Sequence, residues 1–179
     1  MNNFLIDYKL YMGKLARLHK DLQDKPTERH YFFGDLPDFW ANLRSEVNFP
    51  ALVAEYSEVN YVGERNNISK RRVTSFSIVD GYDQAGDVSE MVLKVSNCEK
   101  IAEQVLGRMI SDTDKPFRNI DIESITGEYH ANEANKYVGY RINLTLTDPN
   151  ICVHDKSAWL PEEEEEEEEK QEGTSDADS

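Results

Sequence analysis

The chain has 179 residues, of which 39% are hydrophobic and 31% charged, and its formal net charge is −15. This length suffices for one domain with a sizeable core and is short for two. No stretch approaches the roughly 18 to 20 consecutive apolar residues of a membrane-spanning helix, which argues against a helical membrane protein. The first 22 residues also lack the apolar segment of a signal peptide, so we expect no export.

The negative charge is concentrated at the C-terminal end. Residues 161–179 hold eleven acidic side chains and one lysine, a net of −10, so residues 1–160 carry only −5. Eight consecutive glutamates in this segment repel one another and offer no apolar area for a core. We therefore expect a single domain over 1–160 and a disordered acidic tail over 161–179. The tail is either a solvated brush, or an arm that mimics nucleic acid or binds a basic partner.

The N-terminal third predicts two helices. Lys25-Pro26 should end the first, because the residue before proline avoids helical geometry. This helix lies either on a sheet or against another helix in a short coiled coil. A second, short helix is predicted after Asp35, with Phe39, Trp40 and Leu43 directed inward. The first helix is predicted from apolar residues that recur at spacings of three and four: Phe4, Tyr8, Tyr11, Leu15, Leu18 and Leu22.

The middle of the chain predicts two strands separated by a loop. Residues 51–61 resemble a strand with imperfect alternation, and residues 63–72 read as an extended polar loop. Residues 73–82 alternate with the period of a half-buried strand. The candidate inward positions of the first strand are Val53, Tyr56, Val59 and Tyr61, and those of the second are Thr74, Phe76 and Ile78.

The last third predicts a long helix and a hairpin. The helix begins after a cap at Asp87 or Ser89 and continues to Ser111. Residues 118–130 and 137–147 alternate like strands, and the short polar connection between them predicts an antiparallel hairpin. The expected apolar face of the helix comprises Met91 or Val92, Val95, Cys98, Ile101, Ala102, Val105, Met109 and Ile110. The expected inward positions of the strands are Ile120, Ile122, Ile125, Tyr140, Ile142, Leu144 and Leu146.

These elements predict an α+β fold. In chain order they are helix, helix, strand, strand, helix, strand, strand. We expect a four-stranded antiparallel or mixed sheet packed against the two long helices.

The sequence contains no constellation of residues typical of an enzyme. No histidine pair has the spacing of a zinc site, no glycine-rich loop matches a nucleotide-binding motif, and no serine lies in a nucleophile elbow. The acidic loop over residues 80–87 lacks the ligand spacing of a calcium site. Cys98 and Cys152 are interpreted as core residues. We therefore predict no catalytic residues, no metal and no cofactor.

One basic cluster stands out, formed by Arg65, Lys70, Arg71 and Arg72. Such a cluster can contact nucleic-acid phosphates. In a chain this acidic, and without interleaved aromatic residues, an acidic protein surface or plain solvation fits it better.

The run "SFSIVDGYDQAGDVSEMVLKVSNCEKIAEQVLGRM" and the later "YVGYRINLTLTDP", together with the order of elements, resemble small virion proteins of tailed bacteriophages. The resemblance is to tail-terminator and neck (head–tail joining) proteins, and it covers residues 1–160 in topology. It implies a structural protein of the virion, assembled in the host cytoplasm. It also implies a homo-oligomeric ring, a hexamer or dodecamer, that contacts portal, adaptor or tail-tube proteins. DNA would pass through the ring without specific binding.

The resemblance implies that loops form the subunit interface. Candidate interface residues are Arg65, Lys70, Arg71, Arg72, Asp83, Asp87 and Trp159. Two features depart from the family pattern, the acidic tail and the stretch between Lys25 and Ala51, and they leave the position in the virion open. The alternative is an acidic module that mimics nucleic acid or binds another protein.

Overall fold

The computed structural model describes residues 3–37, 39, 47–64, 67–82, 88–132 and 136–151. The tail over 161–179 that we expected to be disordered lies outside these residues. The described elements follow one another as α1 (Phe4–Leu18), β1 (Tyr31–Phe33), β2 (Ala51–Ala54), β3 (Glu58–Glu64), β4 (Asn67–Gly81), α3 (Val88–Ser111), β5 (Asn119–Asn132) and β6 (Tyr137–Ile151).

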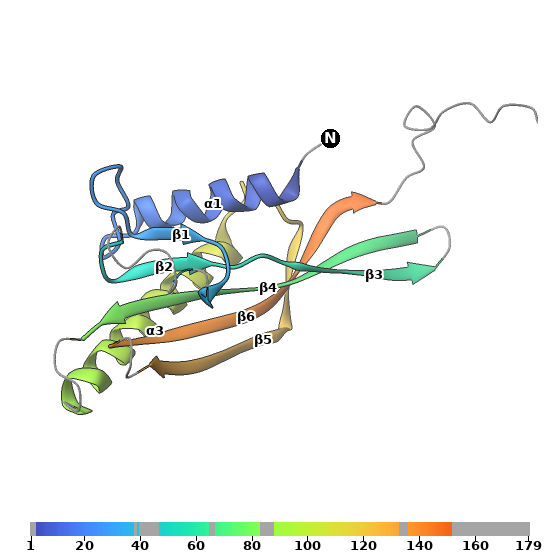
Figure 1. The fold of residues 1–179 in the computed structure, drawn as a ribbon. Coiled ribbons are helices and arrows are strands. Elements are labelled where there is room, and N and C mark those ends of the chain that lie inside the picture. The colour runs from blue at the N-terminus through green and yellow to red at the C-terminus, as the bar shows by residue number, and fades with distance from the viewer. Residues whose placement is uncertain are drawn as a thin grey trace, which may run out of the picture.

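All six of these strands belong to one sheet (Figure 1). Its order is β1-β2-β4-β6-β5, and β3 pairs with β4. The β1–β2 pair is parallel, whereas the other neighbours are antiparallel. The predicted four-stranded sheet and its element order are therefore wrong, since the described chain builds a six-stranded mixed sheet. The predicted antiparallel hairpin of the last two strands is confirmed.

Two strands account for the difference. β1 has only three residues, Tyr31–Phe33, and pairs with residues 52–54. A run this short has too few positions to show a period of two. The short helix predicted after Asp35 lies mostly outside the described residues, although Leu36, Pro37 and Phe39 have helical backbone.

The second difference is that the predicted strand over 51–61 is two strands on one edge of β4. β2 pairs Ala54 with Phe76, and β3 pairs Glu58 with Val73. Three residues therefore separate the two strands on one side and two residues on the other, so the edge contains a one-residue bulge. A bulge bends its strand and interrupts the alternation of faces. The predicted polar loop over 63–72 is instead the end of β3 and the first half of β4.

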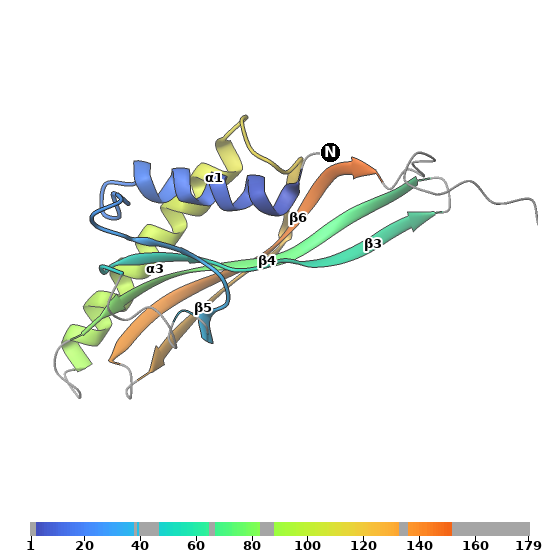
Figure 2. The same cartoon turned by 45° about the horizontal axis from the view of Figure 1, so that its top comes forward.

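The main core lies between the two helices and one face of the sheet (Figure 2). The prediction that Phe76, Ile78, Ile101, Val105, Ile142 and Leu144 are buried together is confirmed. The interpretation of Cys98 as a core residue is also confirmed, whereas Cys152 lies outside the described residues. Four candidates for the buried faces of the helices and strands are exposed instead: Leu18, Val92, Ile110 and Ile122.

A second, smaller core lies on the opposite face of the sheet. It contains Phe39, Val47, Ala51, Val53 and Val79. Residues 74–80 of β4 are consequently buried on both faces. The prediction of a half-buried strand was wrong for this segment, since the covering residues come from a distant part of the chain.

β3 and the first half of β4 extend beyond the helices. Figure 1 shows this hairpin as a long projection at one end of the molecule. We call residues 58–64 and 67–73 the arm, and the helix-covered remainder the body. The end of β6 runs along the arm half of β4, where Arg71 pairs with Thr147 and Ser69 with Ile151. Of the predicted inward residues here, Tyr56, Val59 and Tyr61 are exposed.

Candidate functional site

The arm carries three members of the predicted basic cluster, Lys70, Arg71 and Arg72, on consecutive positions of β4. Successive residues of a strand point to opposite faces. Arg72 faces the helices, because its guanidinium lies 4.0 Å from the centre of the Phe4 ring in α1. Lys70 shares that face, and the exposed Arg71 lies on the other. The other predicted interface residues, Arg65, Asp83, Asp87 and Trp159, lie outside the described residues.

The helix-side face of the arm is both aromatic and basic. Val59 pairs with Arg72 and Tyr61 with Lys70, so these four side chains share one face. Tyr61 is 60% exposed, and the Lys70 ammonium lies 5.8 Å from the centre of its ring. Arg72 joins the arm to the body, whereas Tyr61 and Lys70 face solvent beyond it. An exposed tyrosine beside a lysine is suited to contact with another macromolecule.

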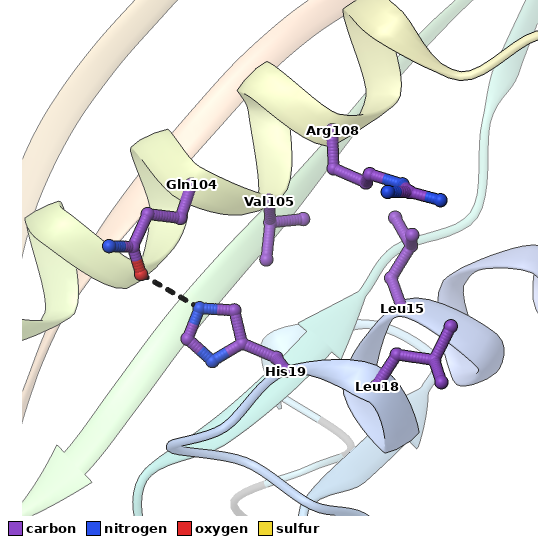
Figure 3. A pocket seen from close by; sticks show the side chains of 6 residues that line it. All are labelled: Leu15, Leu18, His19, Gln104, Val105 and Arg108. Atoms are coloured by element: carbon purple, nitrogen blue, oxygen red, sulfur yellow. Dashed lines mark hydrogen bonds between the residues drawn. The ribbon is translucent and has the colours of Figure 1, made fainter.

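A small pocket of about 210 Å³ lies between the end of α1 and α3 (Figure 3). His19 Nε2 is 2.9 Å from Gln104 Oε1, and the Asp21 backbone N–H donates to His19 Nδ1. Nδ1 is therefore the acceptor, and Nε2 carries the hydrogen that it donates to Gln104. Arg108, also at this pocket, forms an ion pair with Asp112 at 3.4 Å. These polar groups have their partners within the chain. We therefore interpret them as contacts that hold the end of α1 against α3.

A polar network crosses the face of the sheet opposite α1 and α3. Arg141 Nη2 lies 2.8 Å from both Glu55 Oε2 and Ser75 Oγ, and Arg141 Nη1 is 3.8 Å from Glu128. Burial raises the pKa of the Glu55 carboxyl, and the Arg141 guanidinium offsets part of that rise. The network links β2, β4, β5 and β6, and we interpret it as a structural tie.

Two further titratable groups lie in the body. Asp80 accepts from Lys94 at 3.2 Å, which joins the end of β4 to α3. Burial raises the pKa of the Cys98 thiol to about 12, so this sulfur stays protonated at neutral pH. Among the described residues, no group of three or more histidine, cysteine and acidic side chains is arranged to hold a metal ion.

An apolar groove lies at the end of the body farthest from the arm. Its cavity volume is about 550 Å³, and its walls are the first half of α3, the end of β5 and the start of β6. Val88, Val92 and Tyr129 line it and are 58% to 68% exposed. The ring of His130 also lines the groove, and burial lowers its pKa. We call this feature the α3–β5 groove.

Sequence reasoning did not identify the α3–β5 groove. We predicted that Val92 and Val95 belong to the buried face of the helix, but the first buried residue of α3 is Cys98. The available signal was an excess of apolar residues in the first two turns, with Val88, Leu93 and Val92 together covering more than one face. The contribution of β5 to the groove depends on strand pairing and has no local signal.

No protein-family model matches this chain, and a search of curated proteins found no match either. Within the described ranges, none of the helices combines the length and the apolar character needed to cross a membrane.

Proposed function

We propose that the protein is a structural subunit that assembles with copies of itself into a ring in the neck or tail of a tailed-bacteriophage virion. The position is that of a tail terminator, tail-completion protein or head–tail connector. The virion setting rests on the sequence resemblance. The proposal of self-assembly rests on the arm.

The arm is the observation that carries this proposal. The arm consists of β3 and the first half of β4, with the end of β6 paired beside them, and none of its described residues belongs to a buried core cluster. A segment of sheet without a buried apolar face is marginally stable in water, because little apolar area offsets the entropy of ordering it. This arm nevertheless exposes Val59 and Tyr61 on its helix-side face and Val73 on the opposite face, with exposed fractions of 38%, 60% and 40%. A neighbouring subunit that covers these side chains supplies the missing apolar burial.

The remaining features agree with a role in assembly and not in catalysis. A ring subunit needs complementary surfaces on its outside and no reactive centre. The strongly negative chain repels DNA, so a ring of such subunits lets DNA pass without holding it. Its partners would be its own copies and the adjoining portal, adaptor or tail-tube proteins, and it would assemble in the host cytoplasm.

The test is a pair of charge reversals followed through assembly. Lys70→Glu with Arg71→Glu reverses two arm charges and spares Arg72, whose contact with Phe4 supports the fold. We expect this variant to fold normally but to be lost from rings seen by negative-stain microscopy and from purified particles. The matched control is Arg17→Glu with Lys20→Glu, the same charge change at exposed positions of α1 and just beyond its end.

Two results would contradict the proposal. One is a wild-type chain that stays monomeric by light scattering, both alone and with its candidate virion partners. The other is a wild-type chain that binds a basic protein without self-association, which would support the acidic binding module instead.

A further inference from the structure

The α3–β5 groove combines an apolar floor with an acidic border. The apolar part comes from Val88 and Val92, one helical turn apart on α3 and 68% and 58% exposed, together with Met91 and Val95. Apolar side chains at this density on a surface favour contact with a macromolecule. The cavity of about 550 Å³ is large enough for one or two side chains.

The acidic border is built by Glu99 and Glu103 of α3. Tyr129, which lines the groove, donates a hydrogen bond to Glu99 at 2.9 Å. Glu99 and Glu103 both act electrostatically on Tyr129 and raise the pKa of its hydroxyl, chiefly through that hydrogen bond. β5 contains neither lysine nor arginine, and its Glu128 pairs with Arg141 on the opposite face of the sheet. A ligand for this surface must therefore be apolar at its centre and basic at its margin.

The helix-side face of the arm has this composition. Val59 and Tyr61 supply exposed apolar and aromatic surface, and Lys70 lies directly opposite Tyr61 across the strand pair. Residues 67–73 of β4 contain three basic residues and no acidic residue. The two surfaces are thus complementary in both charge and polarity, which favours specific association and sets its orientation.

Geometry prevents the two surfaces of one chain from meeting each other. The arm extends from one end of the molecule, while the start of α3 and the end of β5 lie at the other end (Figure 1). A contact between them must join two copies and leaves one free arm and one free groove on every pair. Such a head-to-tail contact repeats until the rotation closes a ring, or continues as a filament.

We propose that the arm of each subunit docks into the α3–β5 groove of the next, with Tyr61 in the groove and Lys70 facing Glu99 and Glu103. This inference rests on the proposed self-assembly and specifies the two surfaces that form it. The predicted interface contained Asp83 and Asp87 as its acidic residues, whereas this inference pairs Lys70 with the carboxylates of Glu99 and Glu103 in α3.

Charge exchange tests the pairing. Lys70→Glu, and separately Glu99→Lys with Glu103→Lys, should each weaken self-association by at least about tenfold, because unlike charges become like charges. In an equal mixture every contact between unlike variants joins opposite charges, because the unchanged arm meets the unchanged groove and the reversed arm meets the reversed groove. The mixture should therefore form assemblies in which the two variants alternate. The readout is mass by light scattering and sedimentation, with circular dichroism to show that each variant is folded.

Cross-linking locates the contact independently of charge. A chain with Tyr61→Cys mixed with a chain with Val92→Cys should form a disulfide-linked dimer under mild oxidation. The control mixture pairs Tyr61→Cys with Ile110→Cys, an exposed apolar position at the other end of the same helix. The wild-type chain reports the background from its own cysteines, of which Cys98 is buried.

The outcomes separate this inference from the proposed function. Rings that form normally from both charge variants, with equal cross-linking in test and control mixtures, would overturn the docking site and leave self-assembly in place. A wild-type chain that does not self-associate at any concentration, alone or with virion partners, would overturn both. Restored association in the variant mixture, with cross-linking specific to Val92, is the expected result.

Discussion

The two halves of β4 belong to the same strand, yet they occupy opposite environments. Residues 74–80 are buried on both faces, between the helices and the smaller second core. Residues 67–73 lie in the arm, where Val73 is 40% exposed and Arg71 faces solvent. The strand continues without a break because its hydrogen bonds are satisfied along both halves by β3, β2 and β6. The body therefore specifies the fold, and the arm is available for binding.

The largest expected effect tests this division with two aromatic residues. Phe76 is fully buried in the body and Tyr61 is 60% exposed in the arm. Phe76→Ala should lower the free energy of unfolding by about 3–5 kcal/mol, because it leaves a cavity in the core. Tyr61→Ala should change it by less than about 0.5 kcal/mol. Chemical denaturation measures both, and similar losses would show that the arm is part of the folding core.

The next effect tests how closely the body is packed. A Cβ at Gly139 would lie 2.6 Å from the Ile78 carbonyl oxygen and would overlap the ring of His130. Gly139→Ala should therefore cost about 1–3 kcal/mol, since neighbouring backbone in β4 must move.

The matched control for this substitution is Gly107 in α3, where an added Cβ meets nothing within 4 Å. Gly107→Ala should stabilise the protein by about 0.5–1 kcal/mol through helix propensity. Thermal denaturation of both variants gives the comparison. A Gly139→Ala protein as stable as wild type would mean that the sheet is looser than the structure indicates.

A smaller effect locates the boundary between arm and body. The Arg72 guanidinium lies 4.0 Å from the centre of the Phe4 ring, whereas Arg71 is exposed on the opposite face. Arg72→Ala should cost about 0.5–2 kcal/mol through loss of this cation–π contact, and Arg71→Ala less than about 0.5 kcal/mol. The denaturant midpoints of the two variants measure this difference in stability. Equal values would show that the contact of Arg72 with Phe4 does not fasten the arm to the body.

The smallest effect is expected for the acidic tail, which belongs to neither region. Its glutamates supply no apolar area to offset the entropy of ordering. Deletion of residues 162–179 should leave the calorimetric thermal midpoint nearly unchanged. A drop of many degrees would show that the tail packs on the body.

The body was predicted from the sequence to a large extent. The long helix, the C-terminal hairpin and the shared core of Phe76, Ile101 and Ile142 follow from local periodicity, because each amphipathic element has one strongly apolar face. Those signals are properties of neighbouring residues along the chain. They can be recognised without knowing what each element packs against.

The arm and the α3–β5 groove were not predicted, for a related reason. The bulge between Ala54 and Glu58 and the pairing of Tyr61 with Lys70 depend on register against β4. We predicted a loop for the basic residues, because a strand without a buried face does not show the alternation of apolar and polar residues.

The sequence by itself determined the long helix, the C-terminal hairpin and the main core, since periodicity is local. Only the tertiary structure decided that β4 is buried on both faces at one end and exposed at the other. It alone decided that the arm and the α3–β5 groove lie at opposite ends of the molecule. Those outcomes depend on contacts between residues far apart in the chain, which local periodicity does not encode.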